Sequence, residues 1–191
     1  MAGIALVPIY LAERAALLRH LARCLEESLG LAVEVRRPWF DPERAFDPSR
    51  AQYNSTLLLA QLQAGPPGPP PDRVLGVTGV DLFIPVLSYV FGEAQLPGRA
   101  AVVSLHRLDP GLYGLPPDDE RLTGRAEKEA LHELGHTFGL IHCRQAGCVM
   151  RASTYAEEID HKTARFCGDC LVAMRDAVQV FSPGARDVAS L

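Results

Sequence analysis

The sequence predicts an α+β fold, α/β-like in its alternation of strands and helices, in which helices pack on a twisted mixed sheet. Strand and helix patterns alternate through the first two thirds of the chain in the order β-α-β-α-β-β. The last third reads as a helix followed by irregular segments that contain most of the cysteines. With 191 residues, 48% of them hydrophobic, the chain can form one domain, or one domain with a small appendage, without a disulfide framework.

Hydrophobic periodicity predicts the elements in order. Apolar runs or alternation indicate strands at residues 4–10, 31–37, 73–84 and 99–108, with residues 86–96 either strand or irregular. Apolar residues three or four apart indicate helices at residues 12–30, 49–63, 125–140 and 171–181. We expect Gly30 to end the first helix and Ser49 to cap the second. Segments 65–71 and 109–124, rich in Gly and Pro, are predicted to be a stiff surface turn and a loop.

Charge and hydropathy exclude several classes of protein. The 19 basic and 23 acidic residues argue against a nucleic-acid partner that is recognised through a large excess of basic charge. The most apolar stretch, residues 74–91, carries Asp81 and Pro85 and is predicted to be packed core, so no membrane partner is expected. Residues 1–11 are apolar without a basic start, which favours a strand over a signal peptide and predicts a cytoplasmic protein.

The segment LHELGHTFGLIHC has the spacing of a metal site. His132 and His136 are four residues apart, which places them about 40° apart around a helix, so both imidazoles can face one ion. Glu133 lies on the flank of that face, where it can reach a metal-bound water without being a ligand. The pair and the adjacent carboxylate together indicate a hydrolytic zinc site.

His142 can join the same ion only if the helix ends before it. Gly139 lies where that break is needed, because glycine tolerates the positive φ that helix C-termini commonly adopt. Three neutral imidazoles with one open position are typical of catalytic zinc, which lowers the pKa of its water to about 7. Glu133 would take the proton of that water and pass it to the leaving amine.

Four of the five cysteines lie within residues 143–170. An odd count without a secretion signal disfavours disulfides, and the clustering favours a metal. The pattern Cys-x4-Cys, an 18-residue gap and Cys-x2-Cys fits a closed structural zinc site that stabilises the end of the chain. Unligated buried thiols and a redox Cys-x2-Cys at Cys167 and Cys170 are the alternatives.

The motif HExxHxxGxxH followed by a methionine resembles the signature of the metzincin zinc peptidases, and the cysteines around it are similar to those of the archaemetzincins in particular. The resemblance covers residues 132–170 and implies a metzincin-type fold with an active-site helix and a small zinc-bound C-terminal subdomain. The resemblance implies that His132, His136 and His142 bind the catalytic zinc and that Glu133 is the general base. It also implies that Met150 is the Met-turn residue beneath the metal. A second zinc would be bound by Cys143, Cys148, Cys167 and Cys170.

We therefore expect a zinc metallopeptidase that hydrolyses peptide bonds with Glu133 as general base. Its cofactors would be two Zn²⁺ ions per chain, one catalytic and one structural. The substrate would be a peptide or protein, extended along the strand near residues 101–108, and the chain would act as a monomer. Endopeptidase and aminopeptidase action remain alternatives.

We expect two subdomains. Residues 1–142 would form a β/α part that includes the active-site helix, and residues 143–191 would contain the four-cysteine zinc site and the Met-turn. An alternative function is a non-catalytic, zinc-structured peptide-binding module, because a complete ligand set does not guarantee turnover. A zinc-ribbon-like nucleic-acid module is a weaker alternative, since residues 143–170 hold four basic and four acidic residues.

Three other histidines have ordinary interpretations. His20 lies four residues before Cys24 in the first predicted helix, and a surface histidine beside a buried cysteine is favoured over a ligand pair. His106 ends the strand at 99–108 and is expected to be an ordinary exposed residue, with a position in the cleft as the alternative. His161 lies between the cysteine pairs and is an alternative ligand there.

Overall fold

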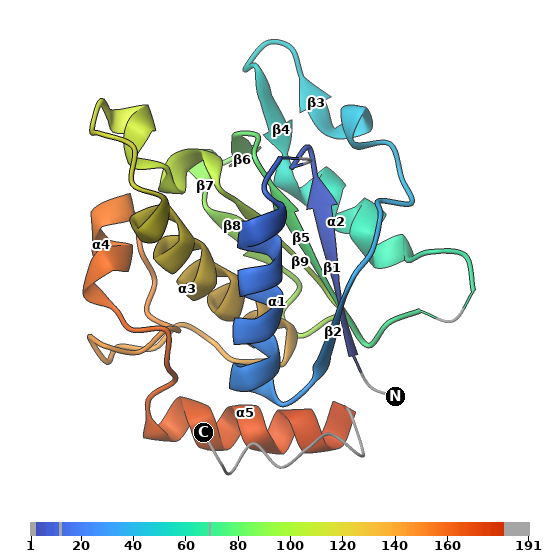
Figure 1. Ribbon diagram of the computed structural model, residues 1–191. Helices are drawn as coiled ribbons and strands as arrows, with labels where there is room; N and C mark the ends of the chain where they lie inside the picture. The colour runs from blue at the N-terminus through green and yellow to red at the C-terminus, as the bar shows by residue number, and fades with distance from the viewer. Residues whose placement is uncertain (1–2, 12, 69, 182–191) are drawn as a thin grey trace.

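A five-stranded sheet forms the centre of the protein. A computed structural model describes residues 3–11, 13–68 and 70–181 (Figure 1). The sheet has the order β2-β1-β5-β9-β8, in which β8 runs antiparallel to β9 and the other neighbours are parallel. Its strands are β1 (Gly3–Ile9), β2 (Ala32–Val35), β5 (Arg73–Thr78), β8 (Gly92–Ala94) and β9 (Ala100–Ser104). The predicted mixed sheet with packed helices is confirmed.

Helices cover both faces of this sheet. Helices α1 (Ala15–Leu29) and α3 (Asp119–Thr137) pack on one face, and α2 (Ser55–Ala64) packs on the other (Figure 1). Successive strand residues point to opposite faces. Leu6 accordingly lies in the core beneath α1 and α3, whereas Val7 lies in the core beneath α2. Burial on both faces explains why β5 and β9 are buried along their whole length.

Smaller elements surround the sheet. A second sheet has the order β3-β4-β6-β7, formed by β3 (Phe46–Asp47), β4 (Gln52–Asn54), β6 (Leu82–Ile84) and β7 (Leu87–Val90). The 3-10 helices among the described residues are η1 (Pro42–Ala45), η2 (His106–Leu108) and η3 (Pro110–Tyr113). The C-terminal part contains α4 (Ala156–His161) and α5 (Gly168–Phe181). Met174 and Val178 of α5 are buried in the same core as α1 and α3.

Helix starts differ from the sequence prediction. The second helix begins at Ser55 instead of residue 49, because the Asn54 side chain accepts a hydrogen bond from the Leu57 amide at 3.2 Å and residues 52–54 form β4. Helix α3 begins at Asp119, inside the predicted loop, with Asp118 as its cap. Acidic residues in its first turn complement the helix dipole, which stabilises a start that carries no apolar pattern.

No helix in the described ranges is both long enough and apolar enough to cross a membrane.

Candidate active site

Three histidines converge at the end of α3. His132 and His136 lie one helical turn apart, and their Nε2 atoms are separated by 3.1 Å. His142 reaches the same place from the segment after the helix, with its ring centroid 5.2 Å from that of His132 and 5.0 Å from that of His136. One donor atom from each ring lies within 4.8 Å of the others. The predicted convergence of these rings is therefore present in the structure.

A tight turn after α3 brings His142 back to the helix. Gly139 has a φ of 95°, in the left-handed region that glycine adopts without a steric penalty. Its amide donates to the carbonyl of His136 at 2.9 Å, and the amide of Leu140 donates to that of Gly135 at 3.1 Å. These bonds satisfy carbonyls that the end of a helix leaves unpaired. The predicted break at Gly139 is confirmed.

Main-chain carbonyls orient the two helical imidazoles. Nδ1 of His132 lies 2.9 Å from the oxygen of Val149, and Nδ1 of His136 lies 2.7 Å from the oxygen of Leu140. Because a carbonyl oxygen only accepts, each Nδ1 atom carries the proton and donates it. Burial lowers the pKa of His132 to about 3 and also lowers the pKa of His136, so both rings are neutral at pH 7. Each ring then presents an Nε2 lone pair to the other.

This arrangement fits a metal ion. Two lone pairs 3.1 Å apart repel each other, and neither Nε2 atom has a proton with which to bridge the gap. A cation that accepts both lone pairs removes the repulsion. An imidazole whose Nδ1 atom donates to a main-chain carbonyl and whose Nε2 atom is free is a typical ligand of zinc.

Glu133 lies against the edge of the large sheet. Its side chain is buried, and a Cβ atom added to Gly92 of β8 would lie 2.6 Å from its Cγ and Oε1 atoms. Burial raises the pKa of Glu133 well above its ordinary value, and the negative charge of Glu129 one turn earlier raises it further, while Lys162 acts in the opposite direction. The carboxyl group thus occupies a confined position between α3 and β8.

Strand β8, and not β9, forms the edge of the sheet beside α3, and the expectation that substrate lies along residues 101–108 is wrong. Strand β9 pairs with β5 on one side and with β8 on the other, so both of its edges are occupied. Within the described residues, β8 ends the strand order and pairs on one side alone. His106 lies beyond β9 in η2 and is half-buried. Local sequence patterns do not specify the order of strands, which explains the error.

Met150 packs beneath α3. Its side chain is fully buried, and a Cβ atom on Gly135 would lie 2.5 Å from the Met150 Sδ atom. The carbonyl of Met150 accepts a hydrogen bond from the amide of Cys143 at 2.9 Å. Met150 is therefore fixed both against the helix that carries His132 and against the segment that carries His142.

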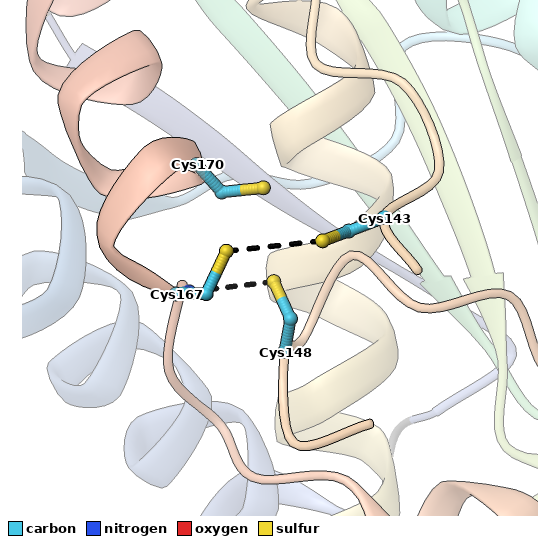
Figure 2. Close-up of side chains that lie close together, drawn as sticks. All are labelled: Cys143, Cys148, Cys167 and Cys170. Atoms are coloured by element: carbon cyan, nitrogen blue, oxygen red, sulfur yellow. Dashed lines mark hydrogen bonds between the residues drawn. The ribbon is translucent and has the colours of Figure 1, made fainter. Parts of the chain in front are cut away.

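The four clustered cysteines point toward one another (Figure 2). Cys143 and Cys148 lie on the loop after α3, Cys167 directly precedes α5, and Cys170 lies in the first turn of α5. Their sulfurs lie within 4.8 Å of one another, and those of Cys143 and Cys167 are 3.8 Å apart. Four thiolates around zinc, each about 2.3 Å from the ion, stand about 3.8 Å apart.

Main-chain amides also point at this sulfur cluster. The amide of Gln145 lies 3.4 Å from the Cys143 Sγ atom, and the amide of Cys167 lies 3.4 Å from the Cys148 Sγ atom. Amide donors of this kind stabilise negative charge on sulfur. All four cysteines are free thiols, so the donor set fits a tetrahedral metal and not a pair of disulfides.

Buried and half-buried ion pairs attach the C-terminal part to α3. The Lys162 Nζ atom lies 2.8 Å from Glu129 Oε1, with both side chains almost fully buried, and donates to the carbonyl of Arg151 at 3.0 Å. Arg125 binds both carboxylate oxygens of Asp160, at 2.8 and 2.6 Å. The sequence patterns do not predict these partners. The one available signal is that Glu129 and Glu133 share a helix face four residues apart.

The remaining candidate residues lie outside the two clusters. His161 ends α4 with an exposed side chain and is not part of the cysteine cluster within the described residues. His20 and Cys24 contact each other, with 3.2 Å between Nε2 and Sγ.

Comparisons with known proteins identify similar peptidases. The model of "Peptidase family M54" matches residues 45–176. The archaemetzincin of Methanocaldococcus jannaschii is 47% identical over 161 residues, which cover 84% of this chain and 86% of that protein. The crystal structure of archaemetzincin from Methanopyrus kandleri superimposes with a TM-score of 0.81 at 38% identity, covering 93% of this chain and 96% of that one. A zinc-dependent peptidase from Methanocorpusculum labreanum gives a TM-score of 0.80 at 32% identity, covering 90% of this chain and 100% of that one.

Proposed function

Because the chain belongs to peptidase family M54, the archaemetzincins, and is a zinc metallopeptidase, we propose that its catalytic zinc is held by His132, His136 and His142 and that Glu133 is the general base. One observation carries the ligand assignment. The Nε2 atoms of two neutral imidazoles, His132 buried and His136 half-buried, lie 3.1 Å apart, an arrangement that is stable with a cation between them. Family membership also favours an enzyme over the alternative of a non-catalytic binding module.

Zinc bound at these histidines would act as a Lewis acid toward water and the scissile carbonyl. Glu133 would accept the proton of the attacking water on its carboxylate and deliver it to the nitrogen of the leaving amine. The confined position of Glu133 between α3 and Gly92 supports this role, because it limits the orientations available to the carboxylate. The carbonyls of Val149 and Leu140 would keep the imidazoles aligned by accepting from Nδ1.

The peptide substrate would bind along β8. In the described part of the chain β2 and β8 are the end strands of the sheet, and β8 is the one beside α3. An extended peptide can add to such an edge through main-chain hydrogen bonds. Gly92 places that edge directly against Glu133. The scissile bond of a peptide paired with β8 would therefore lie next to the general base.

A second zinc would be held by Cys143, Cys148, Cys167 and Cys170. Four sulfur donors leave no open position, so this ion would be structural. Since Cys143 follows His142 directly, the second ion would also fix the segment that presents the third histidine. Met150 would be the Met-turn residue, supported by its contact with Gly135 beneath the histidines.

The division of the chain after His142 remains our proposal. Residues 143–191 would form the subdomain with the cysteine site and the Met-turn, although the last ten of them lie outside the described residues. We also propose a monomer, because both ligand sets come from one chain. A cytoplasmic location stays a prediction.

The variant Glu133→Gln tests the mechanism. It keeps the size of the side chain and removes the proton acceptor, so zinc content should equal that of the wild type while hydrolysis of a peptide library falls by at least about a hundredfold. Added chelator should abolish the activity of the wild type. Full hydrolysis by Glu133→Gln with normal zinc content would refute the role of Glu133.

A further inference from the structure

A third cluster of metal-ligating side chains lies outside the histidine and cysteine clusters. His20 and Cys24 of α1 and Glu127 of α3 each bring one donor atom to within 4.8 Å of the others. The Nε2 atom of His20 lies 3.2 Å from the Sγ atom of Cys24 and 3.3 Å from the Oε2 atom of Glu127. Glu127 is 107 residues beyond His20, so the fold brings the carboxylate to the pair.

The three donors stand on a rigid frame. His20 and Cys24 are one turn apart, which places both side chains on the same side of α1. Leu21 of α1 and Ala126 of α3 are fully buried in one hydrophobic cluster, so the two helices pack against each other directly beside the donors. Donors on packed helices lose little conformational entropy when they bind an ion.

The imidazole, thiol and carboxylate donors suit a borderline transition metal such as zinc. Tetrahedral zinc with nitrogen, oxygen and sulfur ligands places these atoms about 3.4–3.6 Å apart. The two separations in the structure, 3.2 and 3.3 Å, lie within a few tenths of an ångström of those values. The side chains of His20 and Glu127 are 34% and 24% exposed, so an ion can enter from solvent. Mg²⁺ and Ca²⁺ prefer sites made entirely of oxygen ligands.

We propose that His20, Cys24 and Glu127 form an additional metal site, which binds a divalent cation of the zinc class and links α1 to α3. Three protein ligands leave one position for water, which makes the bound ion exchangeable. Glu127 precedes His132 by five residues, a rotation of about 140° around the helix, so this site faces away from the catalytic histidines. Occupancy therefore stabilises the frame of the active-site helix without contact with the catalytic histidines.

Protection of Cys24 from alkylation tests the site directly. The full chain, already loaded with the zinc of its other two clusters, is treated with iodoacetamide at increasing concentrations of zinc chloride, and Cys24 modification is followed by peptide mass spectrometry. Added zinc should slow alkylation of Cys24 at least about tenfold, and the zinc concentration for half protection should rise at least about tenfold in both His20→Ala and Glu127→Gln. Glu27→Gln is the matched control, since it removes an acidic residue of α1, the helix of His20 and Cys24, without removing a donor.

Each outcome decides the proposal. Zinc-dependent protection that is lost in both variants and kept in Glu27→Gln supports the site. Equal alkylation rates with and without zinc in the wild type overturn it, as does protection that Glu127→Gln leaves unchanged. A second measurement is the thermal unfolding midpoint, which should rise with added zinc in the wild type and stay constant in His20→Ala. Neither readout uses hydrolysis, so failure here is distinct from failure of the catalytic assignment.

Discussion

Gly92 of the edge strand and Glu133 of the active-site helix are so close that a single methyl group does not fit between them. A Cβ atom on Gly92 would lie 2.6 Å from Cγ and Oε1 of Glu133 and 2.7 Å from the carbonyl oxygen of Val102. The absence of a side chain at Gly92 therefore allows the carboxylate to lie against β8. This contact joins the proposed general base to the proposed substrate strand.

Gly92→Ala should consequently reduce catalysis while leaving the metal in place. The methyl group pushes the carboxylate away from β8. A misplaced general base loses part of the roughly 10²–10⁴-fold rate acceleration that such a group contributes. We expect kcat for a peptide substrate to fall at least about tenfold with zinc content unchanged. Gly124→Ala is the matched control, because a Cβ atom there meets nothing within 4 Å and should leave kcat unchanged. Wild-type kcat in Gly92→Ala would contradict the assignment.

Gly135→Ala should destabilise the protein by overpacking. Its Cβ atom would lie 2.5 Å from Sδ and 3.1 Å from Cε of Met150, which is fully buried and has little room to move. Overpacking of this kind costs about 1–3 kcal/mol of unfolding free energy, measurable by urea denaturation. Gly124→Ala lies in the same helix and should instead stabilise by up to about 1 kcal/mol. Equal stability of the two alanine variants would show that the contact with Met150 is unimportant.

Loss of Lys162 should lower the free energy of unfolding, because its partner Glu129 is buried. Lys162→Met leaves the Glu129 carboxylate without the ammonium group that lies 2.8 Å away. Removing one member of a buried pair typically costs about 3–5 kcal/mol of unfolding free energy. The double variant Lys162→Met/Glu129→Leu removes both charges and should recover much of that loss. If the double variant is as unstable as the single one, the uncompensated charge is not the cause.

The ion pair between Arg125 and Asp160 should make stability depend on pH in the acid range. The hydrogen bonds that Arg125 donates lower the pKa of Asp160 below its ordinary value. The Asp160 carboxylate therefore binds a proton more readily in the unfolded chain than in the folded one. The stability from this pair is complete well above about pH 4, the ordinary pKa of aspartate, and is lost as the pH falls through the lower folded value. The difference in unfolding free energy between wild type and Asp160→Asn should thus be constant near neutral pH and shrink in acid. A difference that does not change down to pH 2 would contradict this interpretation.

Local patterns predict the parts of this protein that depend on nearby residues. The spacing of His132, His136 and His142, with Gly139 between the last two, is sufficient to predict that the chain turns after the helix and that the three imidazoles converge. The interior position of β9 and the edge position of β8 depend on pairing between distant strands, which no single segment encodes. Glu127 joins His20 for the same reason, since helix packing alone brings them together.

X-ray diffraction at the zinc absorption edge is the decisive test of a catalytic zinc at the three histidines, because an anomalous difference map locates zinc independently of the side chains. We expect a peak within about 2.1 Å of the Nε2 atoms of His132 and His136 and of a ring nitrogen of His142 in crystals of the zinc-loaded protein. Imidazoles that point apart with no anomalous peak among them would contradict it.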